Sequence, residues 1–176
     1  SILCFKKSIE ENPNDKVALR NLSMVIWMQE NLKAEDKPNI WKESIELATN
    51  AVSKDIKDPM SWYILGNAHL TCYFLETDRY EHLNYALKAY TQSEKNEDPN
   101  YPNPDLYYNR GTIWDYLEQY NQAILDYIKA DLIDPNLHAK EKGTKIIDFV
   151  IATSKLIEKW KASKNDKDIK LVKTVP

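Results

Sequence analysis

Hydrophobic residues recur every three to four positions along much of the chain, which is the spacing of one face of an α-helix. The clearest example is the run Ile146, Phe149, Thr153, Leu156 and Trp160, which has lysine and glutamate among the residues between its members. Polar stretches that contain proline and asparagine separate such segments and predict loops. The chain also has only 3 glycines in 176 residues, whereas a sheet protein needs more glycine for its turns. The pattern therefore predicts an all-α fold.

A set of aromatic, small and proline residues repeats along the chain at a fixed period. It begins at Trp62, Leu65 and Gly66 and returns in fuller form over residues 107–135. The members of the second occurrence are Tyr107, Gly111, Trp114, Tyr120, Ala123, Tyr127, Ala130 and Pro135. Small residues let two antiparallel helices touch, rings fill the space between helix pairs, and proline ends the second helix. This spacing resembles the tetratricopeptide repeat (TPR) and predicts a superhelix of antiparallel helix pairs.

The TPR register also predicts the boundaries of the elements. These are 1–13 for the second helix of a truncated repeat, 16–56, 59–98 and 104–135 for three further repeats, 137–162 for a C-terminal capping helix, and 163–176 for a solvated tail or a linker to a missing C-terminal domain. The first two complete repeats carry polar insertions, predicted at 31–39 and 76–82, and a linker is predicted at 94–104. Arg110 stands where the TPR has leucine, so that helix is slightly off-type.

Charge and cysteine content narrow the function classes. The formal net charge of -3 argues against a dedicated nucleic-acid binder, for which a basic face is expected, so we expect no direct DNA binding. Cys4 and Cys72 lie far apart and lack the spacing of a metal or redox motif, which indicates two reduced thiols in a cytoplasmic or nuclear protein. No apolar run approaches the roughly 18 residues of a membrane span.

The histidines do not indicate catalysis. His69, His82 and His138 share no serine, cysteine or carboxylate pattern typical of a triad or a metal site. His69 lies three residues before Cys72 at helical spacing, but it occupies a position where TPR helices pack together, so we interpret it as a core histidine. We therefore expect no enzymatic activity, no cofactor and no metal.

A peptide-binding groove is predicted on the concave side of the superhelix, where the first helices of successive repeats lie side by side. Its side chains mix amide, phenol, hydroxyl and carboxylate groups, which suits an extended peptide held through its backbone and through a basic side chain or an amino terminus. The candidate residues are Arg20, Asn21, Met24, Trp27, Tyr63, Asn67, Asp105, Tyr108, Asn109, Thr112 and Asp115. The pattern favours a non-catalytic adaptor for a protein or peptide partner. For any one of these residues alone, an ordinary solvated helix face is the alternative.

A second function fits the same fold, namely a cochaperone that clamps the C-terminal carboxylate of a chaperone. Such a clamp needs several lysine or arginine side chains, together with asparagines, in consecutive repeats. Arg20, Asn67 and Asn109 match part of that set, whereas the later basic residues are absent. The cochaperone stays open as the alternative to the adaptor.

Residues outside the TPR consensus point to one family. In segments 21–25, 61–67, 73–74, 103–106 and 109–110 the chain resembles the tetratricopeptide repeat protein 5 family, also called the Strap family. The resemblance implies a stress-responsive transcriptional cofactor that scaffolds acetyltransferase and methyltransferase complexes. It also implies a factor that recognises the N-terminus of nascent tubulin at the ribosome. That family carries an oligonucleotide-binding-type β domain after its repeats.

The resemblance further implies roles for individual residues. Three positions that hold the nascent peptide in the family correspond to Trp27, Asp105 and Ala139. Asp105 keeps the family's acid, whereas tryptophan and alanine replace an arginine and a glutamate at the other two positions. The family's ribosome-contacting lysines lie just after the capping helix, near Lys159, Lys161 and Lys164.

Overall fold

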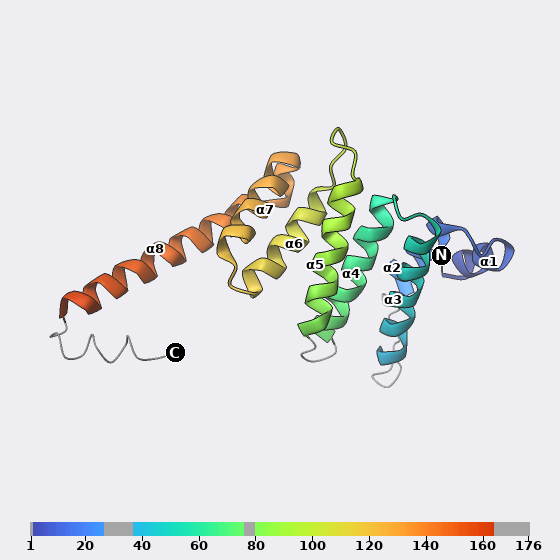
Figure 1. Ribbon diagram of the computed structural model, residues 1–176, viewed down its shortest axis with the longest axis horizontal. Coiled ribbons are helices and arrows are strands. Elements are labelled where there is room, and N and C mark those ends of the chain that lie inside the picture. The colour runs from blue at the N-terminus through green and yellow to red at the C-terminus, as the bar shows by residue number, and fades with distance from the viewer. Residues whose placement is uncertain (1, 27–36, 76–79, 164–176) are drawn as a thin grey trace.

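The computed structural model describes residues 2–26, 37–75 and 80–163 (Figure 1). Its elements are α1 (Ile2–Glu11), α2 (Lys16–Val25), α3 (Lys37–Lys54), α4 (Pro59–Leu75), α5 (Tyr80–Asn96), α6 (Pro104–Tyr116), α7 (Tyr120–Ile133), the 3₁₀ helix η2 (Pro135–Leu137) and α8 (Ala139–Ser163). This described part of the chain contains no strand. The prediction of an all-α TPR superhelix is confirmed.

The helices pack as pairs that stack along the long axis of the molecule (Figure 1). The most extensive contacts lie within the pairs α2–α3, α4–α5 and α6–α7, and α3–α4 and α5–α6 contacts join successive pairs. Helix α1 contacts α2 at one end of the array, and α8 contacts α7 at the other. None of the described helices is long and apolar enough to cross a membrane.

Several helices begin at residues whose side chains satisfy the first backbone N–H groups. Asp15 caps α2, because one of its carboxylate oxygens accepts hydrogen bonds from the N–H groups of Val17 and Ala18, both at 3.0 Å. The side chain of Asn103 caps α6 in a similar way. Helix α4 begins at Pro59, where the missing N–H of proline costs no hydrogen bond.

Small residues set the distance between paired helices. A Cβ atom at Gly66 on α4 would lie 2.5 Å from the ring of Tyr90 on α5. Gly111 on α6 has the same relation to Tyr127 on α7, with 3.1 Å between the added Cβ and the ring. Alanines at the corresponding contacts are fully buried, namely Ala48, Ala51, Ala86, Ala123 and Ala130. The glycines and alanines that the repeat pattern placed at helix contacts therefore do lie where paired helices touch.

Arg110, the off-type residue of α6, has acidic partners on both neighbouring helices. Its guanidinium donates to both carboxylate oxygens of Asp126 on α7 at 2.7 Å and to Glu94 on α5 at 2.6 Å. The side chains of Arg110 and Asp126 are only 10% and 9% exposed. Desolvation lowers the pKa of Arg110, but the hydrogen bonds to Asp126 and Glu94 outweigh it, and the net pKa is raised. An ion cluster thus replaces the apolar contact that leucine would make.

Three predicted loops are shorter than the sequence pattern suggested. Helix α3 begins at Lys37, inside the insertion expected at 31–39, and α5 begins at Tyr80, inside the one expected at 76–82. Helix α5 also continues to Asn96, inside the linker expected from residue 94, because Glu94 belongs to the ion cluster with Arg110. The remaining residues of both insertions, and the tail from 164 to 176, lie outside the described residues.

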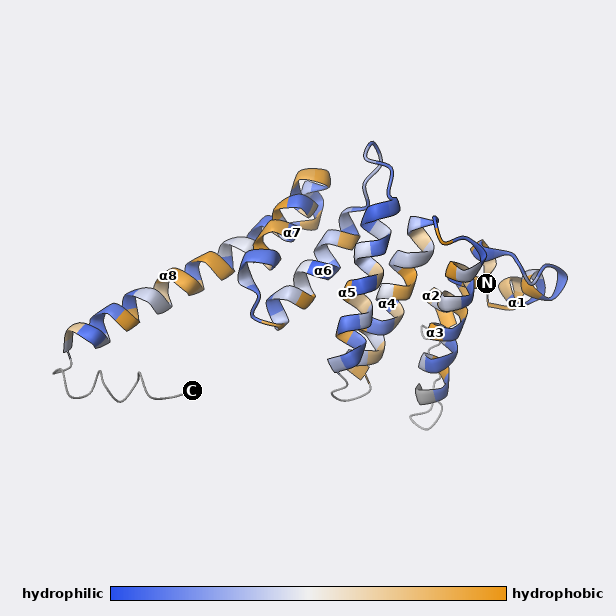
Figure 2. Ribbon diagram, in the orientation of Figure 1, coloured by the Kyte–Doolittle hydropathy of each residue, from blue (hydrophilic) through white to orange (hydrophobic). Residues whose placement is uncertain are grey.

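The predicted capping helix covers its neighbour with only part of its length. Ala139, Gly143 and Ile146 of α8 are buried, whereas Phe149 and Leu156 are 55% and 66% exposed. Helix α8 has 25 residues and α7 has 14, so the second half of α8 extends past the end of α7. Figure 2 shows hydrophobic residues along this projecting part. The predicted capping helix therefore contacts α7 through its first turns.

Candidate functional site

The predicted groove residues that the structure describes lie on helices α2, α4 and α6, which form one side of the stacked pairs. Contacts link α2 to α4. The amide of Asn109 on α6 donates to Asn67 on α4 at 3.1 Å, and the hydroxyl of Tyr73 donates to that of Tyr116 on α6 at 2.7 Å. We call this surface the α2–α4–α6 face. The side chains on it belong to one continuous surface and not to isolated repeats.

Four amide and phenol side chains form the centre of this face. The Oδ1 atom of Asn67 accepts hydrogen bonds from the hydroxyl of Tyr90 at 2.6 Å and from the amide of Asn109 at 3.1 Å. The Asn109 amide also lies 3.5 Å from the hydroxyl of Tyr63. These bonds fix which way both amides point. The sequence predicted Tyr63, Asn67 and Asn109 as groove residues, and the structure brings them together. The sequence did not predict the contact of Tyr90 with Asn67.

The pKa values of the two tyrosines keep the centre of the face uncharged. Burial raises the pKa of Tyr63, and the negative charge of Asp105 raises it further. Burial raises the pKa of Tyr90 even more strongly, and the nearby Tyr63 adds to that effect. Both phenols are therefore neutral at physiological pH and act as hydrogen-bonding groups.

Two hollows flank the central amides. One has a volume of about 440 Å³ and is lined by Asn67, Leu70, Thr71, Phe74, Leu75 and Asn109. A smaller one, of about 40 Å³, lies on the other side and is lined by Ser23, Met24, Ser44, Ile64, Asn67 and Ala68. Asn67 lines both hollows, so the polar centre lies between two mainly apolar depressions. This arrangement offers backbone-like hydrogen-bonding groups next to space for side chains.

At the α2 end of the face, the predicted basic residue is already paired. The guanidinium of Arg20 donates to the carboxylate of Asp58 at 2.6 Å, and Lys16 pairs with Asp55 at the same distance. Desolvation raises the pKa of Asp58, but a hydrogen bond from Ser61 and the charge of Arg20 lower it more, so the net pKa is below its usual value. Arg20 therefore ties α2 to the start of α4. Asn21 is half-buried beside it and Met24 is exposed, while Trp27 lies outside the described residues.

At the α6 end, part of the predicted set is used inside the protein. The hydroxyl of Thr112 donates to the carbonyl of Tyr108 at 3.0 Å and accepts from the hydroxyl of Tyr127 at 3.2 Å. The ammonium of Lys142 on α8 lies 4.6 Å from the centre of the Tyr108 ring. Burial lowers the pKa of Lys142, but its hydrogen bond to Tyr108 and the nearby tyrosines raise it more, so the ammonium stays charged. Tyr108 and Thr112 are thereby held in fixed positions.

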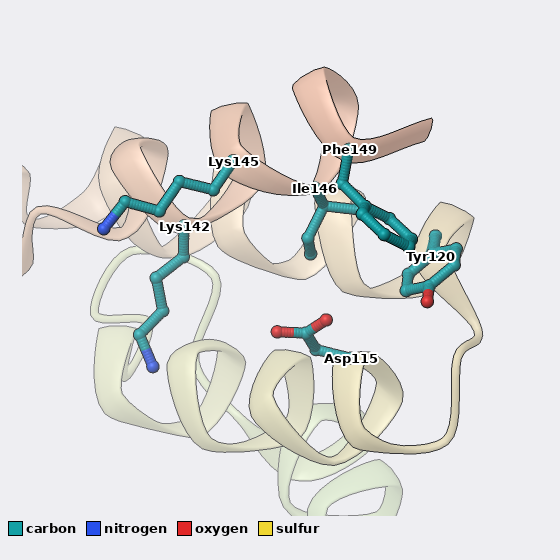
Figure 3. A pocket seen from close by; sticks show the side chains of 6 residues that line it. All are labelled: Asp115, Tyr120, Lys142, Lys145, Ile146 and Phe149. Carbon is teal, nitrogen blue, oxygen red and sulfur yellow. The ribbon is translucent and has the colours of Figure 1, made fainter. Parts of the chain in front are cut away.

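The two predicted acids differ in their surroundings. Asp105 is exposed in the first turn of α6. Asp115 lines a pocket of about 460 Å³ between α6 and α8, opposite Lys142 and beside the rings of Tyr120 and Phe149 (Figure 3). Both carboxylates are available to a basic group of a ligand. Ala139, which the family resemblance placed at a peptide contact, is fully buried at the start of α8 and cannot touch a peptide.

His69 on α4 and His82 on α5 are in contact, which the sequence analysis did not predict. His69 and His82 approach each other with 3.0 Å between their Nδ1 atoms, and the Sγ atom of Cys72 lies 3.6 Å from Nε2 of His82. Burial, and then the neighbouring His82, lower the pKa of His69 to about 4, so it is neutral at physiological pH. Sequence reasoning placed His82 in an inserted loop, which hid the contact. Cys72 is buried, which closes it to a substrate.

No group of histidine, cysteine or acidic side chains within the described ranges could hold a metal ion. The histidine pair therefore contributes to the contact between α4 and α5.

Curated relatives agree with the fold and with the family resemblance. The chain is 33% identical to mouse (Mus musculus) tetratricopeptide repeat protein 5 and 34% identical to the bovine (Bos taurus) protein of the same name, each over 156 residues that make up 88% of this chain. The chain is a tetratricopeptide repeat protein, with a repeat region like that of tetratricopeptide repeat protein 5. It spans about a third of the length of these relatives, since the match covers 35% of each. No protein-family model matches the chain.

Solved structures show the same fold at low sequence identity. One of them is YrrB, described as a TPR protein with an unusual peptide-binding site. It superposes with a TM-score of 0.63 at 20% identity, and the match covers 84% of this chain and 66% of the YrrB chain. TTC0263, a thermophilic TPR protein of Thermus thermophilus, gives a TM-score of 0.63 at 18% identity over 97% of this chain and 85% of its own. Stacked TPR helices form extended surfaces that bind other proteins. These solved structures therefore show the TPR fold of this chain.

Proposed function

We propose that the chain is a non-catalytic adaptor that binds an extended peptide along its α2–α4–α6 face. The observation that carries this proposal is the linked set of Tyr63, Asn67 and Asn109, in which Tyr90 donates to Asn67 and Asn67 in turn accepts from Asn109. Oriented amides can bond the backbone of a peptide in the way that a neighbouring strand would, and the larger hollow, of about 440 Å³, leaves room for a side chain. Restraint of these groups before binding lowers the entropy lost on association.

The charge on this face favours a basic ligand group. Asp105 is an exposed carboxylate and Asp115 is a half-buried one, whereas Arg20 is neutralised by Asp58. A lysine or arginine side chain, or the amino terminus of a chain, would pair with these acids. Together with the resemblance to tetratricopeptide repeat protein 5, this supports the N-terminus of nascent tubulin as the partner, with the cytoplasm as the compartment. Transcription-cofactor complexes in the nucleus are the other partners that the family resemblance suggests.

The cochaperone alternative has no supporting observation. A carboxylate clamp requires cationic side chains that are open to the ligand. Arg20 is the basic residue that the sequence offered for it, and its guanidinium donates to Asp58 at 2.6 Å. We therefore do not propose a clamp, and the experiment below includes a ligand that would reveal one.

Fluorescence anisotropy with a labelled tubulin N-terminal peptide tests the proposal. We expect binding in the micromolar range, with an affinity at least about tenfold lower for Asn109→Ala and for Asp105→Lys. Asp148→Lys makes the same charge change on an exposed part of α8 and should leave the affinity unchanged. Far-UV circular dichroism of each variant confirms that it is folded.

Two results would contradict the proposal in different ways. Absence of binding to the intact chain would rule out tubulin recognition by these repeats, and equal binding by all variants would place the peptide on another surface. A labelled peptide with a free C-terminal carboxylate, compared with its C-terminal amide, tests the clamp. Preference for the free carboxylate would favour the cochaperone.

A further inference from the structure

The larger of the two hollows beside the central amides follows one stripe of α4. Leu70, Thr71 and Phe74 come three, four and seven residues after Asn67, which is the spacing of one helix face. The hollow therefore begins at the amides and extends about two turns, or roughly 10 Å, towards the end of α4. We call it the Leu70 pocket, and its lining residues are Asn67, Leu70, Thr71, Phe74, Leu75 and Asn109.

Contacts with two other rings hold the side chain of Phe74 at the far end of the pocket. Its ring packs edge to face against Tyr73, with 5.3 Å between the centroids, and against Tyr116 on α6, with 6.1 Å. The hydroxyls of Tyr73 and Tyr116 are joined by the 2.7 Å hydrogen bond between α4 and α6. This wall is thus in place before a ligand binds, which lowers the entropy lost on association.

The lining of the Leu70 pocket favours an apolar group. None of its six residues carries a charge, and Leu70, Phe74 and Leu75 present hydrocarbon. The volume of about 440 Å³ lies within the range of roughly 300–1,000 Å³ that is typical of ligand pockets. A charged side chain would lose hydration here without gaining a partner, whereas leucine, methionine or phenylalanine would remove apolar surface from water.

The amide of Asn109 leaves one polar atom open at the edge of the pocket. Its nitrogen is used within the protein, in the 3.1 Å bond to Asn67 and the 3.5 Å contact with Tyr63. Its Oδ1 atom has no hydrogen-bond partner among the residues that the structure describes. This oxygen is not buried, since every buried side-chain oxygen in the described ranges has a partner. It can therefore accept a hydrogen bond from a backbone N–H group.

We infer that the Leu70 pocket takes one large apolar side chain of the bound peptide, and that Oδ1 of Asn109 accepts the backbone N–H of the same residue. The inference rests on the peptide-binding function proposed above and names the class of residue that this face selects. Asn109 lines the pocket, so its oxygen lies beside the space for that side chain. Asp105, one turn earlier on α6, remains for the basic group of the same peptide.

Fluorescence anisotropy with labelled octapeptides and the full 176-residue chain tests the inference. Each peptide has a free amino terminus and one lysine in a host of serine and threonine, and a single leucine is moved through the other positions. We expect leucine at one position to raise the affinity at least about tenfold over the peptide without leucine. Methionine or phenylalanine should substitute for leucine there, whereas aspartate or lysine should not.

A backbone ester tests the role of Asn109. In the octapeptide that binds most tightly, the ester replaces the leucine N–H with an oxygen atom and leaves the side chain unchanged. This replacement should weaken binding to the native chain about fivefold, which is the size expected for one hydrogen bond. It should cause no further loss of affinity in Asn109→Ala, because the oxygen that accepts the N–H is already absent.

Leu75→Asp tests the pocket itself. Leu75 is 52% exposed, and a carboxylate at this position should remove the preference for leucine over serine and favour lysine in its place. Leu132→Asp makes the same change at a leucine that is 79% exposed near the end of α7, and it should leave the preference for leucine unchanged. Far-UV circular dichroism confirms that both variants are folded.

The inference and the proposed function fail in different ways. Equal affinity for leucine and serine peptides at every position, or no binding of any octapeptide, would overturn the inference. A leucine preference that survives Leu75→Asp would place the side chain elsewhere, and an ester effect that survives Asn109→Ala would assign the N–H to another acceptor, so either result would also overturn it. Binding of the tubulin peptide that Asn109→Ala weakens would leave the proposed function standing in each of these cases.

Discussion

Arg110 shows what a single residue contributes to this repeat array. Where leucine would fill a space between helices, its guanidinium joins Asp126 on α7 and Glu94 on α5. Lys129 extends the cluster by pairing with Glu94 at 2.8 Å. A buried charge is tolerated only when its hydrogen bonds are complete, so each partner of Arg110 matters in proportion to its own burial.

Asp126→Ala is expected to lower the free energy of unfolding by about 3 kcal/mol, because it leaves the buried guanidinium of Arg110 with Glu94 alone. Urea denaturation followed by far-UV circular dichroism measures the change. Lys129→Ala, at the exposed edge of the same cluster, should cost less than about 1 kcal/mol. The double variant Arg110→Met with Asp126→Leu should have a free energy of unfolding closer to that of the native chain than Asp126→Ala alone has. Equal decreases in the free energy of unfolding for Asp126→Ala and Lys129→Ala would show that the buried pair of Arg110 and Asp126 stabilises the fold no more than the exposed contact of Lys129.

The contact between His69 and His82 predicts a pH dependence of stability. The pKa of His69 is about 4 in the folded chain, below its ordinary value of 6.5, so the unfolded chain binds the proton more tightly. The contribution of neutral His69 is complete above about pH 6.5 and is lost as the pH falls towards 4. The carboxyl pKa values of Asp58 and Glu94 are lowered, so these groups respond mainly below that window.

Unfolding free energies measured between pH 7 and pH 4.5 test this dependence. We expect the native chain to lose stability as the pH falls, and His69→Gln to show a shallower slope. His138→Gln, at a side chain that is 73% exposed, is the matched control and should keep the native slope. A native slope in His69→Gln would assign the pH dependence to other groups.

Helix pairs are set by small residues facing large rings. Gly66 on α4 and Gly111 on α6 each face a buried tyrosine of the following helix. Gly143 on α8 differs, because the nearest atom to an added Cβ would be 3.7 Å away on Tyr127. Gly66 and Gly111 are therefore needed for the close approach of two helices, whereas Gly143 is needed neither for close approach nor for a turn.

Gly66→Ala is expected to destabilise the chain by about 2 kcal/mol, since its Cβ would overlap the Tyr90 ring, which is buried and bonded to Asn67. Gly143→Ala should instead stabilise it by about 0.5–1 kcal/mol, because alanine has the higher helix propensity and the space is open. Thermal unfolding of both variants compares them directly. A loss of stability in Gly143→Ala would mean that α8 packs on α7 more closely than 3.7 Å implies.

At the scale of the whole molecule, each helix contacts mainly its neighbours in the array. Helix α2 meets α1, α3 and α4, whereas α6 meets α5 and α7, and α7 meets α8. Stability in such an array is roughly a sum of local terms and nearest-neighbour contacts. A defect at one end should therefore leave the other end intact. Among the described helices, α8 contacts mainly α7, and Phe149 and Leu156 in its second half are exposed.

Leu22→Ala tests this independence of the two ends. Leu22 is buried on α2, and its truncation should cost about 2–4 kcal/mol of local stability. We expect faster amide hydrogen exchange in α2 and α3, with exchange in α6 and α7 unchanged. The mirror variant Ile113→Ala on α6 should produce the opposite pattern. Faster exchange across the whole array in both variants would show global cooperative unfolding.

The sequence by itself determined the helical repeat fold and the surface on which a ligand is proposed to bind. Gly66, Gly111 and the alanines at helix contacts lie at positions that the repeat period marks, because helical periodicity assigns each residue to a face of its own helix. The same periodicity placed Tyr63, Asn67 and Asn109 on neighbouring helices of one face. These are properties of single helices and of their order along the chain.

Only the tertiary structure decided which side chains meet across helices. The guanidinium of Arg20 is paired within the protein, because the carboxylate of Asp58, 38 positions away in the sequence, lies 2.6 Å from it. The partners of Arg110 and the contact of His69 with His82 likewise depend on how long each helix is and how it is rotated against its neighbour. Local periodicity carries no information on these distances, because they arise from the packing of the whole array.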